Sequence, residues 1–127
     1  MSNDELARRA VACKGWRWAP GMLTQHGRIC GAGYLVSDDI DEGGQPYVEC
    51  TDTIDDWSGL LPDLTDPATV GCLLALVREA WGRDGIHARK MGDDIWGVYL
   101  DPWLKRRPIA VAGSQADALV AALEAAP

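Results

Sequence analysis

The sequence has little of what enzymes and metal sites usually require. It contains two histidines, His26 and His87, and no two of its four cysteines lie within a few residues of each other. Zinc sites usually take at least two ligands from one short turn, so this spacing argues against zinc. We therefore expect no metal, no cofactor and no catalytic set. The four cysteines are Cys13, Cys30, Cys50 and Cys72.

Long hydrophobic runs are also missing. No apolar run approaches the roughly 18 residues that indicate a membrane-spanning helix, and no signal peptide precedes Leu6. We expect a protein of the reducing cytoplasm, with its cysteines as free and mostly buried thiols. Two disulfides are the disfavoured alternative, because a chain with this much apolar material does not need such crosslinks.

Positive charge is scarce as well. Twelve Lys and Arg residues stand against nineteen Asp and Glu residues, which gives a net charge of −7. Nucleic-acid binding depends on neutralising phosphates with Lys and Arg, so this balance disfavours nucleic acids and anionic membranes as partners. Two readings of the acidity stay open: it serves solubility alone, or it forms an acidic face that docks on a basic partner protein.

What the sequence does contain is enough for one globular domain. Its 127 residues are 47% hydrophobic and 24% charged, close to the averages for soluble proteins. Residues 1–127 are therefore expected to form a single domain with a real hydrophobic core. Bulk disorder and repetitive architectures do not fit this composition.

Three helices are predicted. The first covers residues 3–14 and begins at a capping box formed by Ser2 and Glu5. The second covers 67–81 between a capping Asp66 and a terminating glycine, and the third begins at a capping Ser114. An apolar stripe at helical spacing makes the second helix the expected centre of the core: Val70, Leu73, Leu74, Val77 and Trp81.

Five strands are predicted, over residues 28–36, 46–51, 86–91, 95–100 and 108–112. The order of elements is then α-β-β-α-β-β-β-α. Short connections between neighbouring strands favour antiparallel pairing. The expected class is α+β, a single layered domain with a mainly antiparallel sheet covered by helices.

Acidic and tryptophan-containing loops predict a surface for a protein partner. The acidic turn over 38–44 is not an EF-hand, because Ile40 stands where a calcium ligand is needed and no helix flanks the turn. Tryptophan is a frequent anchor residue at protein interfaces. The residues expected in this surface are Asp38, Asp39, Asp41, Glu42, Asp55, Asp56, Trp57 and Trp103.

Two other functions stay open. The basic run Lys105, Arg106 and Arg107, together with tryptophan stacking, fits the binding of a small ligand such as a nucleotide signal. A thiol-dependent hydrolase would need a cysteine within hydrogen-bond reach of one histidine. Residues 67–126 also follow the α-β-β-β-α order of a double-stranded-RNA-binding domain, but the start of their last helix lacks the basic cluster that contacts phosphates.

Three segments, 6–22, 66–82 and 116–126, resemble small phage and prophage proteins that carry a phage ABA-sandwich domain. The stretch 30–56 departs from that family's pattern. The resemblance implies a layered α/β/α fold and a phage or prophage origin in a bacterial host. It brings no catalytic residues, because the family has no established activity.

These observations predict a non-enzymatic accessory protein that works by binding a host or phage protein in the host cytoplasm. The specific hypothesis is inhibition of a host defence complex or of a nucleic-acid-processing complex. The acidic loops would then face a basic surface of the partner.

Overall fold

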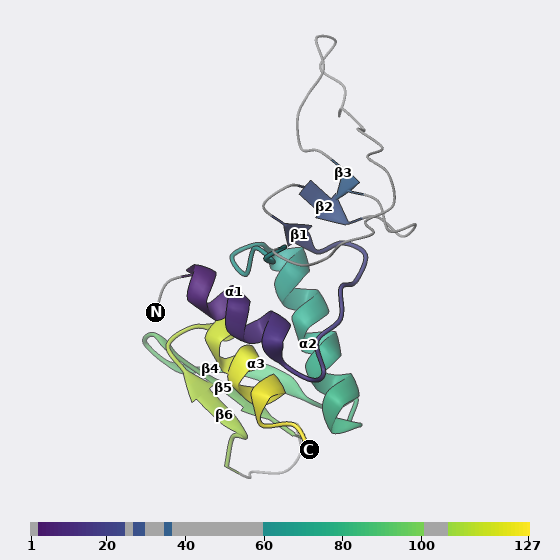
Figure 1. Cartoon of the computed structure of the whole chain (residues 1–127). Helices are drawn as coiled ribbons and strands as arrows, with labels where there is room; N and C mark the ends of the chain where they lie inside the picture. The colour runs from purple at the N-terminus through teal and green to yellow at the C-terminus, as the bar shows by residue number, and fades with distance from the viewer. Residues whose placement is uncertain (1–2, 25–26, 30–34, 37–59, 101–106) are drawn as a thin grey trace.

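The computed structural model of the chain describes residues 3–24, 27–29, 35–36, 60–100 and 107–127 (Figure 1). Within these ranges the chain forms three helices and six strands. In order they are α1 (Asn3–Ala12), β1 (Leu23–Thr24), β2 (Gly27–Ile29), β3 (Leu35–Val36), α2 (Pro67–Trp81), β4 (His87–Gly92), β5 (Ile95–Tyr99), β6 (Ala110–Ala112) and α3 (Gln115–Glu124).

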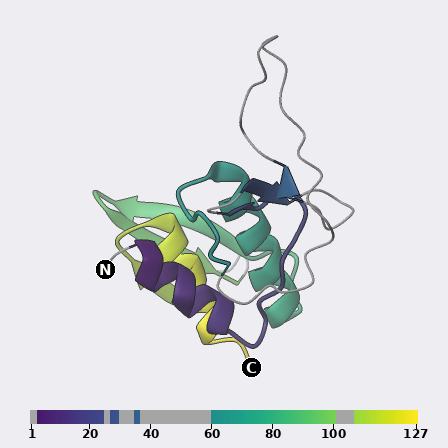
Figure 2. The same cartoon turned by 45° about the horizontal axis from the view of Figure 1, so that its top comes forward.

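The predicted α+β class is confirmed. The strands form two antiparallel three-stranded sheets, β1-β2-β3 and β4-β5-β6. Helix α3 packs on one face of the β4-β5-β6 sheet, and α1 lies beside α3 on the side away from that sheet (Figures 1 and 2). The alternation of a helix, a group of strands, a second helix, three strands and a third helix is as predicted.

The region before α2 differs from the prediction in detail. The single strand expected over 28–36 is wrong, because β2 and β3 pair antiparallel with Arg28 opposite Val36, so the chain reverses between them. The sequence between them contains two glycines, a residue type that weakens a continuous strand. Strand β1 was not predicted. The strand expected over 46–51 lies outside the described residues.

Helix α2 has the bounds that its sequence predicts. The Asp66 side chain accepts a hydrogen bond from the backbone N–H of Thr69, and Pro67 occupies the first turn. Gly82 ends the helix in the left-handed conformation, with φ of 65°, and its N–H donates to the carbonyls of Arg78 and Glu79. Both ends are thus fixed by local chemistry.

The first and third helices also follow their predictions. Helix α1 ends at Ala12, two residues before the predicted end, and its expected cap Ser2 lies outside the described residues. At the start of α3 the Ser114 hydroxyl accepts a hydrogen bond from the backbone N–H of Asp117. The strands β4, β5 and β6 fall within two residues of their predicted bounds.

One core cluster joins both sheets and all three helices. Most of its members come from α1, β2, α2, β5 and α3, and most of them are almost fully buried. Helix α3 supplies the largest share, since it lies between α1 and the β4-β5-β6 sheet. Side chains at the centre of this cluster include Leu6, Ile29, Leu73, Leu76, Val77, Val98, Leu119 and Val120.

Candidate protein-binding face

The β4-β5-β6 sheet has one covered face and one open face. Val98 of β5 is fully buried in the core under α3, and Trp96 packs on the same side. Side chains alternate along a strand, so Ile95 and Tyr99 lie on the opposite side. In the register of the sheet, Gly97 is paired with Arg89 of β4 on one side and with Val111 of β6 on the other. Arg89 and Val111 therefore lie on the same face as Ile95 and Tyr99.

We call this opposite side the outer face, formed by His87, Arg89, Met91, Ile95, Tyr99 and Val111. It gathers all the large hydrophobic side chains that are exposed among the described residues. Met91 is 48% exposed, Ile95 46% and Val111 51%. Single exposed hydrophobics are ordinary on a protein surface, whereas protein interaction sites present contiguous apolar patches.

The absence of a side chain at Gly97 shapes the centre of the outer face. A Cβ atom at this position would lie 2.7 Å from Met91 Sδ and 3.1 Å from Tyr99 Cε2. The register shift between Lys90 and Gly92 marks a bulge around Met91. Met91 therefore lies over Gly97, with Ile95 and Val111 on neighbouring positions of the same face.

Beside the apolar part, the outer face carries a small aromatic and cationic cluster. The Arg89 guanidinium carbon lies 4.6 Å from the centre of the Tyr99 ring, which is a cation–π contact. The His87 ring stacks on Tyr99 with centroids 5.5 Å apart and planes 20° apart. Tyr99 itself is only 8% exposed. An apolar area bordered by Arg and aromatic groups is the composition typical of protein interfaces.

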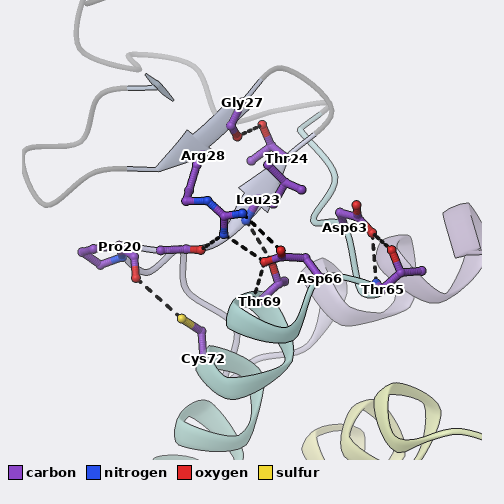
Figure 3. Close-up of polar contacts among 11 residues, drawn as sticks. Pro20, Leu23, Thr24, Gly27, Arg28, Asp63, Thr65, Asp66, Thr69 and Cys72 are labelled. Carbon is purple, nitrogen blue, oxygen red and sulfur yellow. Dashed lines mark hydrogen bonds and ion pairs between the residues drawn. The ribbon is translucent and has the colours of Figure 1, made fainter. Parts of the chain in front are cut away.

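A second polar cluster, shown in Figure 3, connects the β1-β2-β3 sheet to α2. The Arg28 guanidinium donates to both carboxylate oxygens of Asp66, at 3.0 and 3.1 Å, and to the Gly21 carbonyl at 2.8 Å. The Thr69 hydroxyl, which is fully buried, donates to Asp66 and accepts from the backbone N–H of Leu23. Every polar group named here has a partner within the cluster, so its role is structural.

These contacts make Asp66 a strong acid. The Arg28 guanidinium, assisted by the hydrogen bonds from Thr69, lowers the pKa of the Asp66 carboxyl from 3.8 to about 2, although partial burial acts in the opposite direction. The carboxylate is therefore charged at all physiological pH values and cannot act as a general acid.

The described thiols are not arranged for catalysis. Cys13 Sγ donates to the Arg9 carbonyl at 3.2 Å, and Cys72 Sγ donates to the Pro20 carbonyl at 3.6 Å. Burial raises the pKa of both thiols, which keeps them protonated. The described histidine, His87, stacks on Tyr99 instead. The other residues that the thiol-hydrolase hypothesis uses lie outside the described residues: Cys30, Cys50 and His26.

Most of the residues that the sequence suggested for binding fall outside the part of the chain that the structure describes. This holds for the whole predicted partner surface, Asp38, Asp39, Asp41, Glu42, Asp55, Asp56, Trp57 and Trp103, and for Lys105 and Arg106. Arg107 is described and exposed, at the start of the segment that leads into β6.

Tryptophans within the described ranges have structural roles. Trp16 and Trp18 pack edge to face with ring centroids 5.4 Å apart and contact the core. The Trp81 indole N–H donates to the Ala122 carbonyl at 2.8 Å, which ties α2 to α3. Trp81 was predicted to be a core residue from its place in the helical stripe, and it is partly buried and packs against the core cluster.

The described residues include no group of three or more His, Cys, Asp or Glu side chains placed to hold a metal ion. None of the described helices has both the length and the hydropathy to cross a membrane. Comparisons of the chain with protein-family models, with curated proteins and with solved structures find no match.

Proposed function

We propose that this protein acts by binding another protein through the outer face of the β4-β5-β6 sheet. The observation that carries the proposal is the gathering of Met91, Ile95 and Val111 on one open face while α3 covers the other. Removing an apolar sheet face from water would stabilise the complex by about 25 cal/mol for each Å² of apolar surface buried.

The surroundings of this patch support a protein as the ligand. Small-molecule sites are concave, whereas the outer face is the surface of a sheet. Arg89 and His87 border the patch and supply donors for polar contacts at its rim. Methionine, tyrosine and arginine are the residue types that interface centres favour over lysine, glutamate and serine.

The biological setting is part of the same proposal. The resemblance to phage proteins and the acidic composition support a phage-encoded accessory protein of a bacterial cytoplasm. Its partner would be a host defence complex or a nucleic-acid-processing complex. The predicted acidic residues, such as Asp38 and Asp55, would then add electrostatic attraction to a basic partner surface.

The proposal is tested with a photo-crosslinking amino acid placed at 95 or at 111 in the full chain, expressed in bacterial cells. The matched control position is Arg8, which is exposed on α1. We expect one protein to crosslink from both outer-face positions and not from position 8, and mass spectrometry identifies it.

Substitutions then decide whether that contact provides binding energy. Val111→Asp places a charge in the apolar patch, and Ala75→Asp adds the same charge at an exposed position of α2. We expect Val111→Asp to abolish capture of the crosslinked protein and Ala75→Asp to leave it unchanged, with both variants folded by circular dichroism. Equal capture by both variants would show that the outer face is not the binding surface.

A further inference from the structure

A groove lies at the starts of the three helices, on the helix side of the β4-β5-β6 sheet and away from the outer face. It consists of two adjoining hollows of about 390 and about 510 Å³, both lined by Asn3 and Leu64. The segment from 60 to 66 runs between the first turns of α1 and α2 (Figure 1). The first turn of α3, beginning at Ser114, closes the far end.

The floor of the groove is apolar. Leu6 and Leu64 are buried at its base, and the walls add aliphatic and proline side chains from both hollows. An apolar side chain of a ligand would therefore find hydrophobic contacts there. The apolar wall residues are Leu61, Pro62, Pro67, Val70 and Ala116.

Among the described residues that line the groove, the charged side chains are all negative. They are Asp4, Asp63 and Asp117, and the described lining of the two hollows includes no lysine, arginine or histidine. The three helix starts oppose this charge, because each carries roughly half a positive unit charge. Three full carboxylate charges exceed that sum by about a factor of two. The nearby Asp66 does not enter the comparison, because Arg28 pairs with it.

Two of these carboxylates are held in place. The Asp63 carboxylate accepts hydrogen bonds from the backbone N–H and the hydroxyl of Thr65, and the Asp117 carboxylate accepts from the Ser114 hydroxyl. Fixed carboxylates lose little conformational entropy when a cation pairs with them. They also leave lone pairs available, since a carboxylate accepts more bonds than these.

We propose that this groove binds a cationic segment of a partner polypeptide, with an apolar side chain on the Leu6 and Leu64 floor and flanking lysine or arginine side chains at Asp4, Asp63 and Asp117. The sign of the lining charge disfavours a phosphate-bearing ligand. Two open, adjoining hollows suit an extended segment. This site lies on a different surface from the proposed binding face and goes beyond that function.

The test uses the full chain labelled with ¹⁵N and a defined probe, a synthetic peptide of alternating leucine and lysine with blocked ends. A peptide of alternating leucine and glutamate is its control. We expect the lysine peptide to shift the amide resonances of Asp4, Leu64 and Asp117, and the glutamate peptide to shift none of them. Shifts confined to other regions, or equal shifts with both peptides, would overturn the proposal.

Charge-neutralising variants separate the groove from the general attraction of an acidic chain. Asp4→Asn with Asp117→Asn removes two groove charges, and Glu79→Gln with Asp84→Asn removes two charges near the opposite end of α2. We expect the first pair to weaken lysine-peptide binding about five- to tenfold and the second to change it less than about twofold. Equal weakening by both pairs would overturn the proposal.

The outer face provides the last control. The Val111→Asp variant should bind the lysine peptide as the unchanged chain does, because Val111 lies on the opposite side of the sheet from the groove. Loss of peptide binding in this variant would assign the peptide to the outer face and overturn the groove. The two proposals therefore fail separately.

Discussion

Asp66 serves two elements at once. Its carboxylate caps α2 by accepting hydrogen bonds from the backbone N–H and the hydroxyl of Thr69. It also accepts hydrogen bonds from both terminal nitrogens of Arg28 in β2. A bidentate pair of this kind is stronger than an ordinary surface ion pair. Arg28 also donates to the Gly21 carbonyl, so one guanidinium fixes the segment before β1, strand β2 and the start of α2.

The Asp66→Asn variant should lower the free energy of unfolding by about 2 kcal/mol at neutral pH. Asparagine keeps the capping acceptor, so the loss reports the charge pairing with Arg28. The folded pKa of about 2 is below the ordinary 3.8, so this stabilisation is complete above about pH 4 and is lost as pH falls through 2. Urea titrations across this range measure it.

The matched control is Asp84→Asn, which changes an exposed carboxylate after α2. It should alter the free energy of unfolding by less than about 0.5 kcal/mol. The difference between the Asp66 variant and the unchanged chain should shrink between pH 4 and pH 2. A difference that stays constant over that range would contradict the assigned ion pair.

At the scale of single elements, α2 was fully predictable because its signals are local. Asp66 and Pro67 mark the start, Gly82 marks the end, and the apolar spacing fills the interval. The strands β1, β2 and β3 were not predictable, because two or three residues give no periodicity to detect. The apolar residues of 28–36 resemble one strand, and only the pairing of β2 with β3 shows the reversal.

The outer face was half predictable. Alternation in the predicted strand over 95–100 separates Ile95 and Tyr99 from Trp96 and Val98. It does not say which set is covered, since that depends on where α3 packs after some fifteen intervening residues of chain. The bulge that brings Met91 over Gly97 is likewise a tertiary feature. The charges of the loops, by contrast, are visible in the sequence without knowledge of the fold.

A glycine within α2 and the glycine that ends it should respond to substitution with opposite signs. Gly71 lies on the exposed side of the helix with no atom within 4 Å of an added Cβ, so Gly71→Ala should stabilise the protein by about 1 kcal/mol. Gly82 has a positive φ of 65°, so Gly82→Ala should destabilise it by about 1 kcal/mol. Thermal unfolding of the two variants checks this, and a shift in the same direction for both would refute the assigned helix end.

At the scale of the whole molecule, the two sheets share one core. Ile29 of β2 and Val98 of β5 belong to the same buried cluster, joined by Leu73 of α2 and Leu119 of α3. The Arg28 and Asp66 pair adds a polar link between the first sheet and α2. A core that joins elements in this way is expected to unfold as one cooperative unit, which is what the single-domain prediction requires.

Shortening a core side chain on the β1-β2-β3 side or on the β4-β5-β6 side should therefore destabilise the whole domain in the same way. Ile29→Ala and Leu119→Ala each remove a buried side chain, and each should lower the free energy of unfolding by about 2–5 kcal/mol. Circular dichroism follows the helices, while fluorescence follows the six tryptophans, which are placed from Trp16 to Trp103 in the sequence. We expect the two signals to give coincident transitions in the unchanged chain and in both variants. If Ile29→Ala shifted only part of the transition, the β1-β2-β3 sheet would be a separately folding unit, and the single domain over 1–127 would be wrong.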